Sequence, residues 1–207
     1  MKKFVLPICL TVAFIVFTVL VCCIDAQPVA PDGSLVGFAT INQAVHKFFG
    51  ISNTWYRVTQ ILGLVAIVVA FAFAVVGFVQ LLQRRSFVQV DRSLIVLGCV
   101  YVAVIVLYIL FEKLALNVRP VLTSEGLEPS YPSTHTLLIL TIFGTARYQL
   151  KQYVSNKSWQ IVIDVLCLLV MVTAVAGRLV CGVHWCTDIV GGVILSLALI
   201  RFYKAFA

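Results

Sequence analysis

The chain alternates long apolar runs with short polar segments, and the lengths of these runs are the first guide to its structure. Three uncharged runs, residues 4–24, 61–82 and 93–111, are long enough to cross about 30 Å of hydrocarbon at about 1.5 Å per helical residue. A fourth run, residues 161–177, contains Asp164 near one end and follows Trp159, which stands where an interfacial aromatic anchor is expected. Each run predicts a membrane-spanning helix.

Two later apolar runs, residues 136–146 and 189–200, are short unless their helices begin in the polar segments before them. Helices that begin near His135 and His184 carry polar side chains to the membrane boundary, where ionisable groups usually have a function. We therefore expect an all-α, polytopic bundle of six transmembrane helices, forming a single membrane domain over residues 1–207. The approximate spans are 4–24, 57–82, 93–113, 134–153, 159–177 and 185–203.

Residues 25–56 separate the first two spans and contain Pro28, Pro31 and Gly33, so we expect an outer loop there. Within it, residues 41–49 predict an interfacial helix. The first apolar run exceeds the roughly 7–15 residues of a secretory signal core. We therefore expect it to remain as an anchor helix.

The composition favours a membrane protein and argues against a soluble one. Of the 207 residues, 62% are hydrophobic and 11% are charged, whereas soluble domains have roughly 45–50% and 25%. The net charge of +7 would suit nucleic acid, but the basic residues are scattered between apolar runs and form no basic arm. We expect the lipid bilayer as partner and no nucleic acid, and we find no signal for an oligomeric state.

The basic residues also predict an orientation. With the N-terminus in the cytoplasm, ten of the fifteen basic residues lie on the inner side, in agreement with the positive-inside rule. We therefore expect a multi-pass protein of the cell membrane with both termini in the cytoplasm. The five basic residues left on the outer side are Lys47, Arg57, Lys113, Arg119 and Arg178.

Polar residues that suit catalysis form three clusters, all on the predicted outer side. Folding six helices into one bundle brings the clusters to a common pocket. Three cations, two histidines and one carboxylate suit phosphoryl transfer, because the charge of that transition state is spread over three equatorial oxygens. The clusters are Lys113 with Arg119 and Pro120, then Ser133, Thr134 and His135, then Arg178 with His184 and Asp188.

His184 and Asp188 are four residues apart, which places them on one face of a predicted helix. The carboxylate there fixes the imidazole tautomer and stabilises the positive charge of a phosphohistidine. We therefore assign His184 as the nucleophile and Asp188 as its orienting group. His135 remains as the general acid, at a predicted helix N-terminus where Ser133 and free backbone donors suit an anion.

Ordinary structural interpretations stand beside these assignments. A lone arginine or histidine at a membrane boundary is more often an interfacial anchor, and we keep this interpretation for His46. Cys181 and Cys186 flank His184, but a zinc site there lacks a fourth ligand and a paired-cysteine spacing. The cysteine positions indicate no disulfide framework. Independent anchors do not explain why both histidines and Asp188 occur on one membrane face.

These residues resemble the motifs of the type 2 phosphatidic acid phosphatase family, which shares its phosphate pocket with the vanadium haloperoxidases. The third motif of that family is Ser-Arg, five residues, His, three residues, Asp, and Gly177–Asp188 has the same spacing. The second motif, Pro-Ser-Gly-His, corresponds to Pro132–His135. The first motif, Lys, six residues, Arg-Pro, corresponds to Lys113–Pro120, which is one residue shorter.

The resemblance implies a six-helix membrane enzyme that requires no metal or other cofactor. It implies His184 as nucleophile, His135 as general acid and Asp188 as orienting residue. Two positions differ in type, because Gly177 replaces Ser and Thr134 replaces Gly. The shorter first motif turns the lysine by about 100° on a helix. The phosphate-binding residues that the resemblance implies are Lys113, Arg119, Ser133, Thr134 and Arg178.

We therefore expect hydrolysis of a lipid phosphomonoester or pyrophosphate at the outer membrane face, through a phosphohistidine intermediate. Undecaprenyl pyrophosphate, phosphatidic acid and phosphatidylglycerophosphate are all compatible substrates. The main alternative is an anion or lipid transporter, which needs neither the His–Asp pair nor a second histidine. A catalytically silent lipid-binding relative is a third possibility, which the shorter first motif keeps open.

Overall fold

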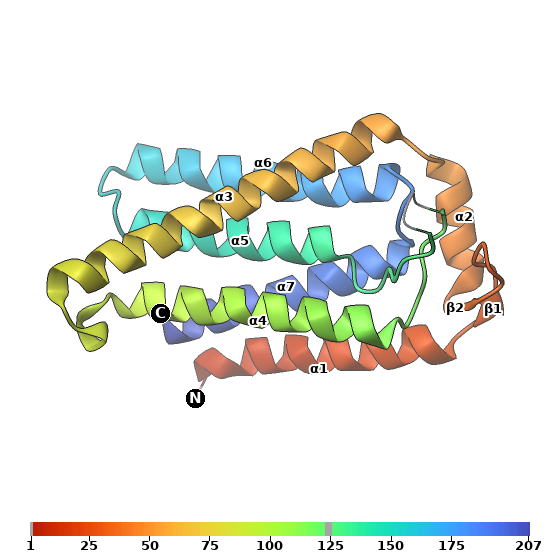
Figure 1. The fold of residues 1–207 in the computed structure, drawn as a ribbon, viewed down its shortest axis with the longest axis horizontal. Helices are drawn as coiled ribbons and strands as arrows, with labels where there is room; N and C mark the ends of the chain where they lie inside the picture. Colours follow the sequence, from red (N-terminus) through yellow and green to blue (C-terminus); the bar gives the residue numbers. More distant parts are fainter. Residues whose placement is uncertain (1, 123–125) are drawn as a thin grey trace.

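The structure, a computed structural model, describes residues 2–122 and 126–207, and these residues are mostly helical (Figure 1). This confirms the predicted all-α class, with one short β-ribbon added. The described elements, in chain order, are α1 (Lys2–Cys23), β1 (Gln27–Pro28), β2 (Leu35–Val36), α2 (Ala39–Phe49), α3 (Asn53–Arg84), the 3-10 helix η1 (Phe87–Gln89), α4 (Arg92–Leu114), α5 (Thr134–Lys151), α6 (Lys157–Val180) and α7 (Cys186–Phe206).

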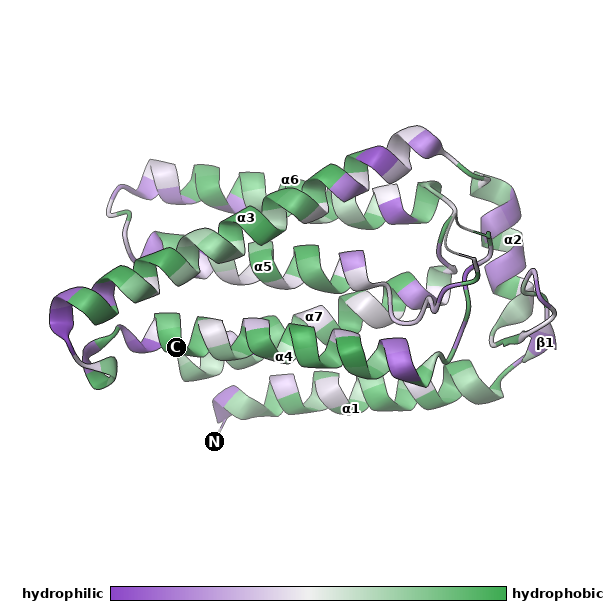
Figure 2. Ribbon diagram, in the orientation of Figure 1, coloured by the Kyte–Doolittle hydropathy of each residue, from purple (hydrophilic) through white to green (hydrophobic). Residues whose placement is uncertain are grey.

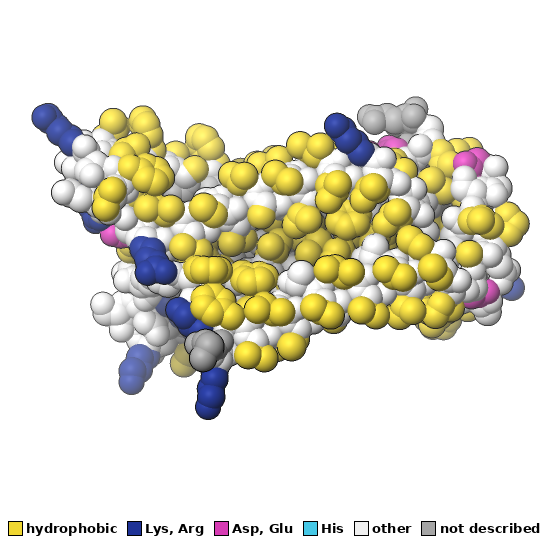
Figure 3. All heavy atoms as spheres, turned by 90° about the horizontal axis from the view of Figure 1, so that it is seen from below, with side chains coloured by type: hydrophobic (Ala, Val, Ile, Leu, Met, Phe, Trp, Pro, Cys, Tyr) yellow, Lys and Arg dark blue, Asp and Glu magenta, His cyan; other side chains and the backbone are white. Residues whose placement is uncertain are grey.

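Five described helices are long and apolar enough to cross a membrane, namely α1, α3, α4, α6 and α7. Their apolar side chains cover much of the outer surface, as Figure 3 shows for one face of the molecule. Figure 2 shows the same arrangement along the ribbon, with apolar residues along the helices and polar residues concentrated toward the two ends of the bundle. An exposed apolar surface of this extent suits lipid.

Helix α5 lies in the middle of the bundle and packs against α3, α4, α6 and α7 (Figure 1). Its 18 residues span about 27 Å at about 1.5 Å per residue, and most of them are buried. A helix surrounded by protein does not need a lipid-facing apolar surface. This explains why its sequence carries the weaker hydropathy signal.

The predicted outer loop forms one end of the bundle, opposite the end where both termini lie (Figure 1). In it β1 and β2 pair antiparallel, with Gln27 opposite Val36. Helix α2 confirms the predicted helix in this loop. Its side chains Ile41 and Phe48 are exposed, whereas Asn42 is completely buried.

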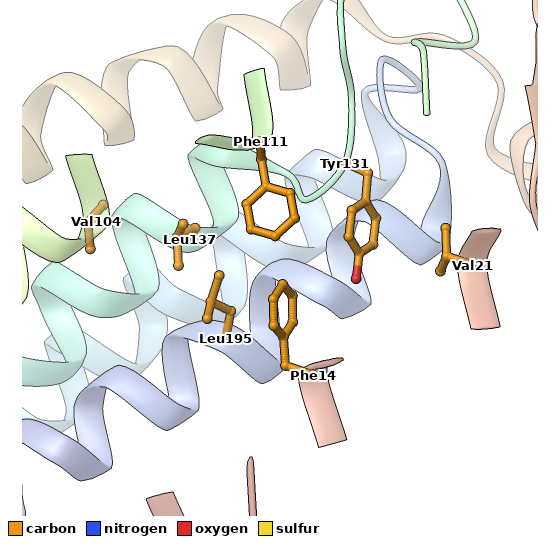
Figure 4. Packing of buried hydrophobic residues seen from close by; sticks show 7 residues of the cluster. All are labelled: Phe14, Val21, Val104, Phe111, Tyr131, Leu137 and Leu195. Atoms are coloured by element: carbon orange, nitrogen blue, oxygen red, sulfur yellow. The ribbon is translucent and has the colours of Figure 1, made fainter. Parts of the chain in front are cut away.

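A buried apolar cluster joins α1, α4, α5 and α7 to the segment before α5 (Figure 4). The ring of Tyr131 stacks on Phe14 of α1 with centroids 6.3 Å apart, and it meets Phe111 of α4 edge-on at 6.0 Å. Its hydroxyl forms a 2.8 Å hydrogen bond with Thr18 of α1. Aromatic contacts with a satisfied hydroxyl hold a segment firmly, so α1 and α4 fix the approach to α5.

Two glycines let α7 lie very close to this segment. A Cβ atom at Gly191 would lie 2.7 Å from the Tyr131 ring, and one at Gly192 would lie 3.0 Å from the carbonyl oxygen of Ser133. At this short separation the amide of Ser133 donates to the carbonyl of Asp188 at 2.9 Å. The glycines therefore bring the start of α5 and the start of α7 into direct contact.

We expect Gly191→Ala to destabilise the protein, because its methyl group overlaps the Tyr131 ring. Overpacking of this kind costs about 1–3 kcal/mol, which should appear as a lower melting temperature in detergent. The matched control is Gly98→Ala on α4, where nothing lies within 4 Å of an added Cβ atom. Equal melting temperatures for the two variants would contradict the close approach of α7.

Candidate active site

The predicted site residues, with the exception of Lys113, meet at the end of the bundle away from the chain termini. They come from the loop after α4 and from the starts or ends of α5, α6 and α7. Asn117 and Ser133 both contact Asp188, since the Asn117 side chain donates to Oδ1 at 3.4 Å and the Ser133 amide donates to the carbonyl. Asp188 thus joins the three segments that carry the predicted clusters.

His184 is almost completely buried and is held through one ring nitrogen. Its Nδ1 lies 3.1 Å from the carbonyl oxygen of Ser130 and 3.5 Å from Oδ2 of Asp188. A carbonyl oxygen can only accept, so Nδ1 carries the proton and Nε2 carries the lone pair. The buried Nε2 has no hydrogen-bond partner among the described residues. This tautomer presents a free nitrogen suited to nucleophilic attack.

The pairing of His184 with Asp188 was predicted, but its geometry differs from the prediction. Helix α7 begins at Cys186, so His184 precedes the helix and does not share a helical face with Asp188. The carboxylate of Asp188 instead accepts the amide of Trp185 at 2.9 Å and caps the helix start. The one-face prediction was wrong, because the chain turns into α7 only after His184.

The surroundings of His184 keep its imidazole neutral. Burial lowers its pKa well below the ordinary value, and the positive charges of Arg178 and Arg119 lower it further. The hydrogen bond to the Ser130 carbonyl opposes this shift only in part. The Nε2 lone pair is therefore available near neutral pH.

Arg178 is completely buried in the last turn of α6. Its Nη1 donates to the hydroxyl of Thr59 at 3.2 Å, and its guanidinium carbon lies 5.9 Å from the centre of the Tyr56 ring. Its Nε and Nη2 have no hydrogen-bond partner among the described residues. A buried guanidinium with two unpaired nitrogens suits a bidentate anion such as phosphate.

Arg119 is the second cation of the site, and it has a partner that the sequence analysis missed. Its guanidinium forms a 2.7 Å ion pair with Glu128, whose carbonyl also accepts the Arg119 amide at 3.0 Å. The Arg119 Nε is buried without a partner in the described part of the chain. Glu128 thus fixes the arginine while one nitrogen stays unpaired. No spacing rule singles out such a loop carboxylate.

The start of α5 supplies backbone donors, as predicted. Ser133 is buried and caps the helix. Its Oγ accepts two hydrogen bonds from Thr136, one from the hydroxyl at 3.0 Å and one from the backbone amide at 3.5 Å. Thr134 and His135 follow as the first two helical residues, whose amides have no acceptor within the helix. Such a helix start suits an anion. The assignment of Ser133 and Thr134 to phosphate stays a prediction.

Lys113 is the predicted residue that the structure does not bring to the cluster. It lies exposed in the last turn of α4, and it has no ion pair or hydrogen bond among the residues described. Arg119 and Arg178 are the cations that contribute to the electrostatic environment of His184. The role of Lys113 in phosphate binding stays a prediction.

Two residues of α2 hold the segment around His184, and the sequence analysis assigned neither to the site. Asn42 is completely buried; its Oδ1 accepts the amide of Thr187 at 3.2 Å, and its Nδ2 donates to the Thr187 hydroxyl at 2.9 Å. His46 bonds through Nε2 to the carbonyl of Gly182 at 3.0 Å. His46 therefore contacts the loop between α6 and α7, which carries His184, and is not a lone interfacial anchor.

The described residues contain no group of three or more His, Cys, Asp or Glu side chains that could hold a metal ion. The two thiols that flank His184 have acceptors of their own. Cys181 donates to the Arg178 carbonyl at 3.2 Å, and Cys186 donates to Oδ1 of Asn42 at 3.1 Å. The zinc alternative gains no support from this arrangement.

A groove of about 460 Å³ opens between α3, α4 and α5. Leu64 and Ile67 of α3 and Val104 of α4 are among its apolar lining residues. Thr134 and His135 also line it. The groove therefore joins the candidate site to the lipid-facing surface of the bundle.

Comparison with known proteins gives a family and a fold. The family model described as the PAP2 superfamily matches residues 111–207, which contain all three motifs. The solved structure described as the first transmembrane PAP2 type phosphatidylglycerolphosphate phosphatase from Bacillus subtilis has a TM-score of 0.64 at 19% identity, covering 99% of this chain and 94% of that chain. No curated protein matches this sequence. The fold and the apolar helices identify a multi-pass membrane protein.

We expect acid to destabilise the protein through His184. Because folding lowers its pKa, the unfolded chain takes up a proton below about pH 6.5 while the native imidazole stays neutral, so stability is lost as the pH falls below that value. The melting temperature of His184→Gln should fall less than that of the wild type between about pH 7.5 and pH 5.5. Lys113→Gln, at an exposed position, should behave as the wild type. Equal slopes for all three proteins would contradict a buried neutral imidazole.

Proposed function

The chain belongs to the PAP2 superfamily through residues 111–207, and from this premise we propose that it is a membrane phosphatase that hydrolyses lipid phosphates. The observation that carries the proposal is a set of buried nitrogens without hydrogen-bond partners among the described residues: Arg119 Nε, Arg178 Nε and Nη2, and His184 Nε2. Buried polar groups are normally paired. An anionic group at this site would pair the arginine nitrogens and meet the histidine lone pair.

In the proposed first step, the lone pair of His184 Nε2 attacks phosphorus, and the bond between phosphorus and the lipid oxygen breaks. His135 gives its proton to the leaving oxygen. Arg119 and Arg178 stabilise the charge on the equatorial oxygens. As the imidazole of His184 becomes positive, its Nδ1 proton is held by the Ser130 carbonyl and the Asp188 carboxylate.

In the second step, water attacks the phosphohistidine from the side of His135. The new bond between oxygen and phosphorus forms, the bond to Nε2 breaks, and the electron pair returns to His184. His135 takes the proton of the attacking water and so regains the proton it lost. Inorganic phosphate leaves, and neither step of this scheme requires a metal ion.

The apolar groove supports a lipid as the substrate. It runs from the lipid-facing surface between α3 and α4 to Thr134 and His135, so a hydrocarbon chain lying in it places its head group at the site. Such a chain passes from one apolar environment, the bilayer, to another, so it enters the groove without exposing apolar surface to water. The phosphatidylglycerophosphate named for the Bacillus subtilis structure is the first substrate to test, together with phosphatidic acid and undecaprenyl pyrophosphate.

We place the site at the outer face of the membrane. Lys and Arg side chains gather at one end of the molecule in Figure 3, whereas acidic side chains are more prominent at the other end. The candidate site lies at the end opposite the termini (Figure 1). The positive-inside rule then puts both termini in the cytoplasm.

We expect purified wild-type protein in detergent to release inorganic phosphate from a lipid phosphate in the presence of EDTA. His184→Ala should lose at least about 1,000-fold in rate, because the nucleophile is gone, and His135→Ala should lose about 100-fold or more. Cys99→Ala on the exposed surface of α4 is the control. Phosphate release by His184→Ala at the wild-type rate would contradict the nucleophile assignment. Complete loss of wild-type activity in EDTA would contradict the metal-free scheme. Vanadate binding without any turnover would favour a binding protein or transporter.

The orientation has a separate test with two tags. A protease added outside intact cells should cleave a tag inserted after Gly33 in the outer loop and should leave a tag at the C-terminus intact. Membrane disruption, which exposes both tags, is the control. Cleavage of the C-terminal tag in intact cells would reverse the proposed orientation.

A further inference from the structure

One face of α3 contacts both the candidate general acid and the buried arginine, although α3 lies outside the residues matched by the family model. Tyr56, Thr59, Gln60 and Gly63 are three or four residues apart and therefore share this face. A Cβ atom at Gly63 would lie 3.2 Å from Cδ2 of His135. The glycine thus leaves room for the imidazole against α3.

Gln60 determines which nitrogen of His135 carries a proton. The amide nitrogen of Gln60 donates to the Tyr56 hydroxyl at 2.8 Å, and its Oε1 is hydrogen-bonded to Nε2 of His135. An amide oxygen can only accept, so Nε2 of His135 is the donor. Gln60 and His135 both line the apolar groove. Gln60 therefore holds the Nε2 proton of His135 at the end of this groove, which leaves Nδ1 as the nitrogen that gives and takes the transferred proton.

Thr59 performs a corresponding role for Arg178. It is completely buried, and its hydroxyl donates to the Tyr56 carbonyl at 2.9 Å, which leaves a lone pair to accept Nη1 of Arg178 at 3.2 Å. A Cβ atom at Gly177 would lie 2.8 Å from Cγ2 of Thr59. The absence of a side chain at position 177 thus gives Thr59 the space to reach the arginine.

We propose that Gln60 and Thr59 are positioning residues of the phosphatase reaction, Gln60 for the proton donor His135 and Thr59 for the phosphate ligand Arg178. This inference rests on the proposed function. The two residues act on different parts of the reaction, because proton donation affects departure of the lipid oxygen, whereas the guanidinium binds the phosphate itself. Substitution of Gln60 should therefore affect two substrates with different leaving groups unequally, whereas substitution of Thr59 should affect them equally.

The test compares an alkyl phosphate with an aryl phosphate. The alkoxide leaving group of phosphatidic acid needs a proton from a general acid, whereas p-nitrophenolate leaves without one. Gln60→Leu should lower the single-turnover rate of diacylglycerol release from phosphatidic acid at least about tenfold and change the single-turnover rate of p-nitrophenolate release less than about twofold. These rates report the first step alone and leave out the attack of water, in which His135 acts on either substrate. His135→Ala should show the same selectivity. Gln60→Glu, which keeps an acceptor oxygen, should return the ratio of the two rates toward the wild-type value.

Thr59→Val should show no selectivity between the two substrates, because it removes the hydrogen-bond partner of Arg178 and leaves that of His135 in place. We expect the rates on both substrates to fall by the same factor, and vanadate inhibition to weaken about tenfold, since a hydrogen bond to a charged group is lost. The control for Thr59→Val is Thr141→Val, at a buried hydroxyl without a partner in the described chain. The control for Gln60→Leu is Gln83→Leu, at an exposed position of α3.

The outcomes separate this inference from the proposed function. If the wild type hydrolyses neither substrate, the proposed function fails and the inference fails with it. If the wild type is active and Gln60→Leu lowers both rates equally, the role of Gln60 is overturned while the phosphatase stands. Equal vanadate inhibition of Thr59→Val and Thr141→Val overturns the role of Thr59. Each variant is compared at equal amounts of folded protein, which elutes from a size-exclusion column in detergent at the wild-type position. If Gln60→Leu fails to fold, Gln60→Met is used for the same comparison.

Discussion

Arg178 carries its positive charge inside the bundle with no exposed surface, and of its three guanidinium nitrogens only Nη1 has a hydrogen-bond partner among the described residues. Burying a charge that is not fully paired is costly, by several kcal/mol in real proteins. The face of Tyr56 compensates for part of this cost through its contact with the guanidinium. A bound anion would pair the remaining nitrogens. We therefore interpret Arg178 as a buried cation whose unpaired nitrogens suit an anionic ligand.

The same region of the fold holds His184, the proposed nucleophile, and Asp188 contacts most of the groups around it. The Asp188 carboxylate caps α7 and contacts His184, while its backbone carbonyl accepts the amide of Ser133. The glycines at 191 and 192 bring these groups within reach. The contacts that start α7 are thus also contacts that hold His184. Under the proposed mechanism, stability and chemistry depend on the same few atoms.

The sequence was informative where physical rules act over short distances. Long apolar runs predicted the helices, and the fixed spacing of Arg178, His184 and Asp188 predicted a cluster that the structure brings together. The shape of the turn at Cys186, which excludes His184 from α7, depends on contacts with α2 that lie far away in the chain. Thr59 and Gln60 are ordinary polar residues in a spanning helix, so no local pattern distinguishes them before the helices are packed.

The central claim is that Nε2 of His184 receives the phosphoryl group. The most direct measurement is to mix the wild type with a lipid phosphate labelled with ³²P, quench in alkali within one turnover, and map the labelled peptide by mass spectrometry. A phosphohistidine is stable in alkali and labile in acid, so we predict label of this kind on His184 and none in His184→Ala. Label on another residue, or turnover by a route that leaves His184 unlabelled at every time point, would contradict the account.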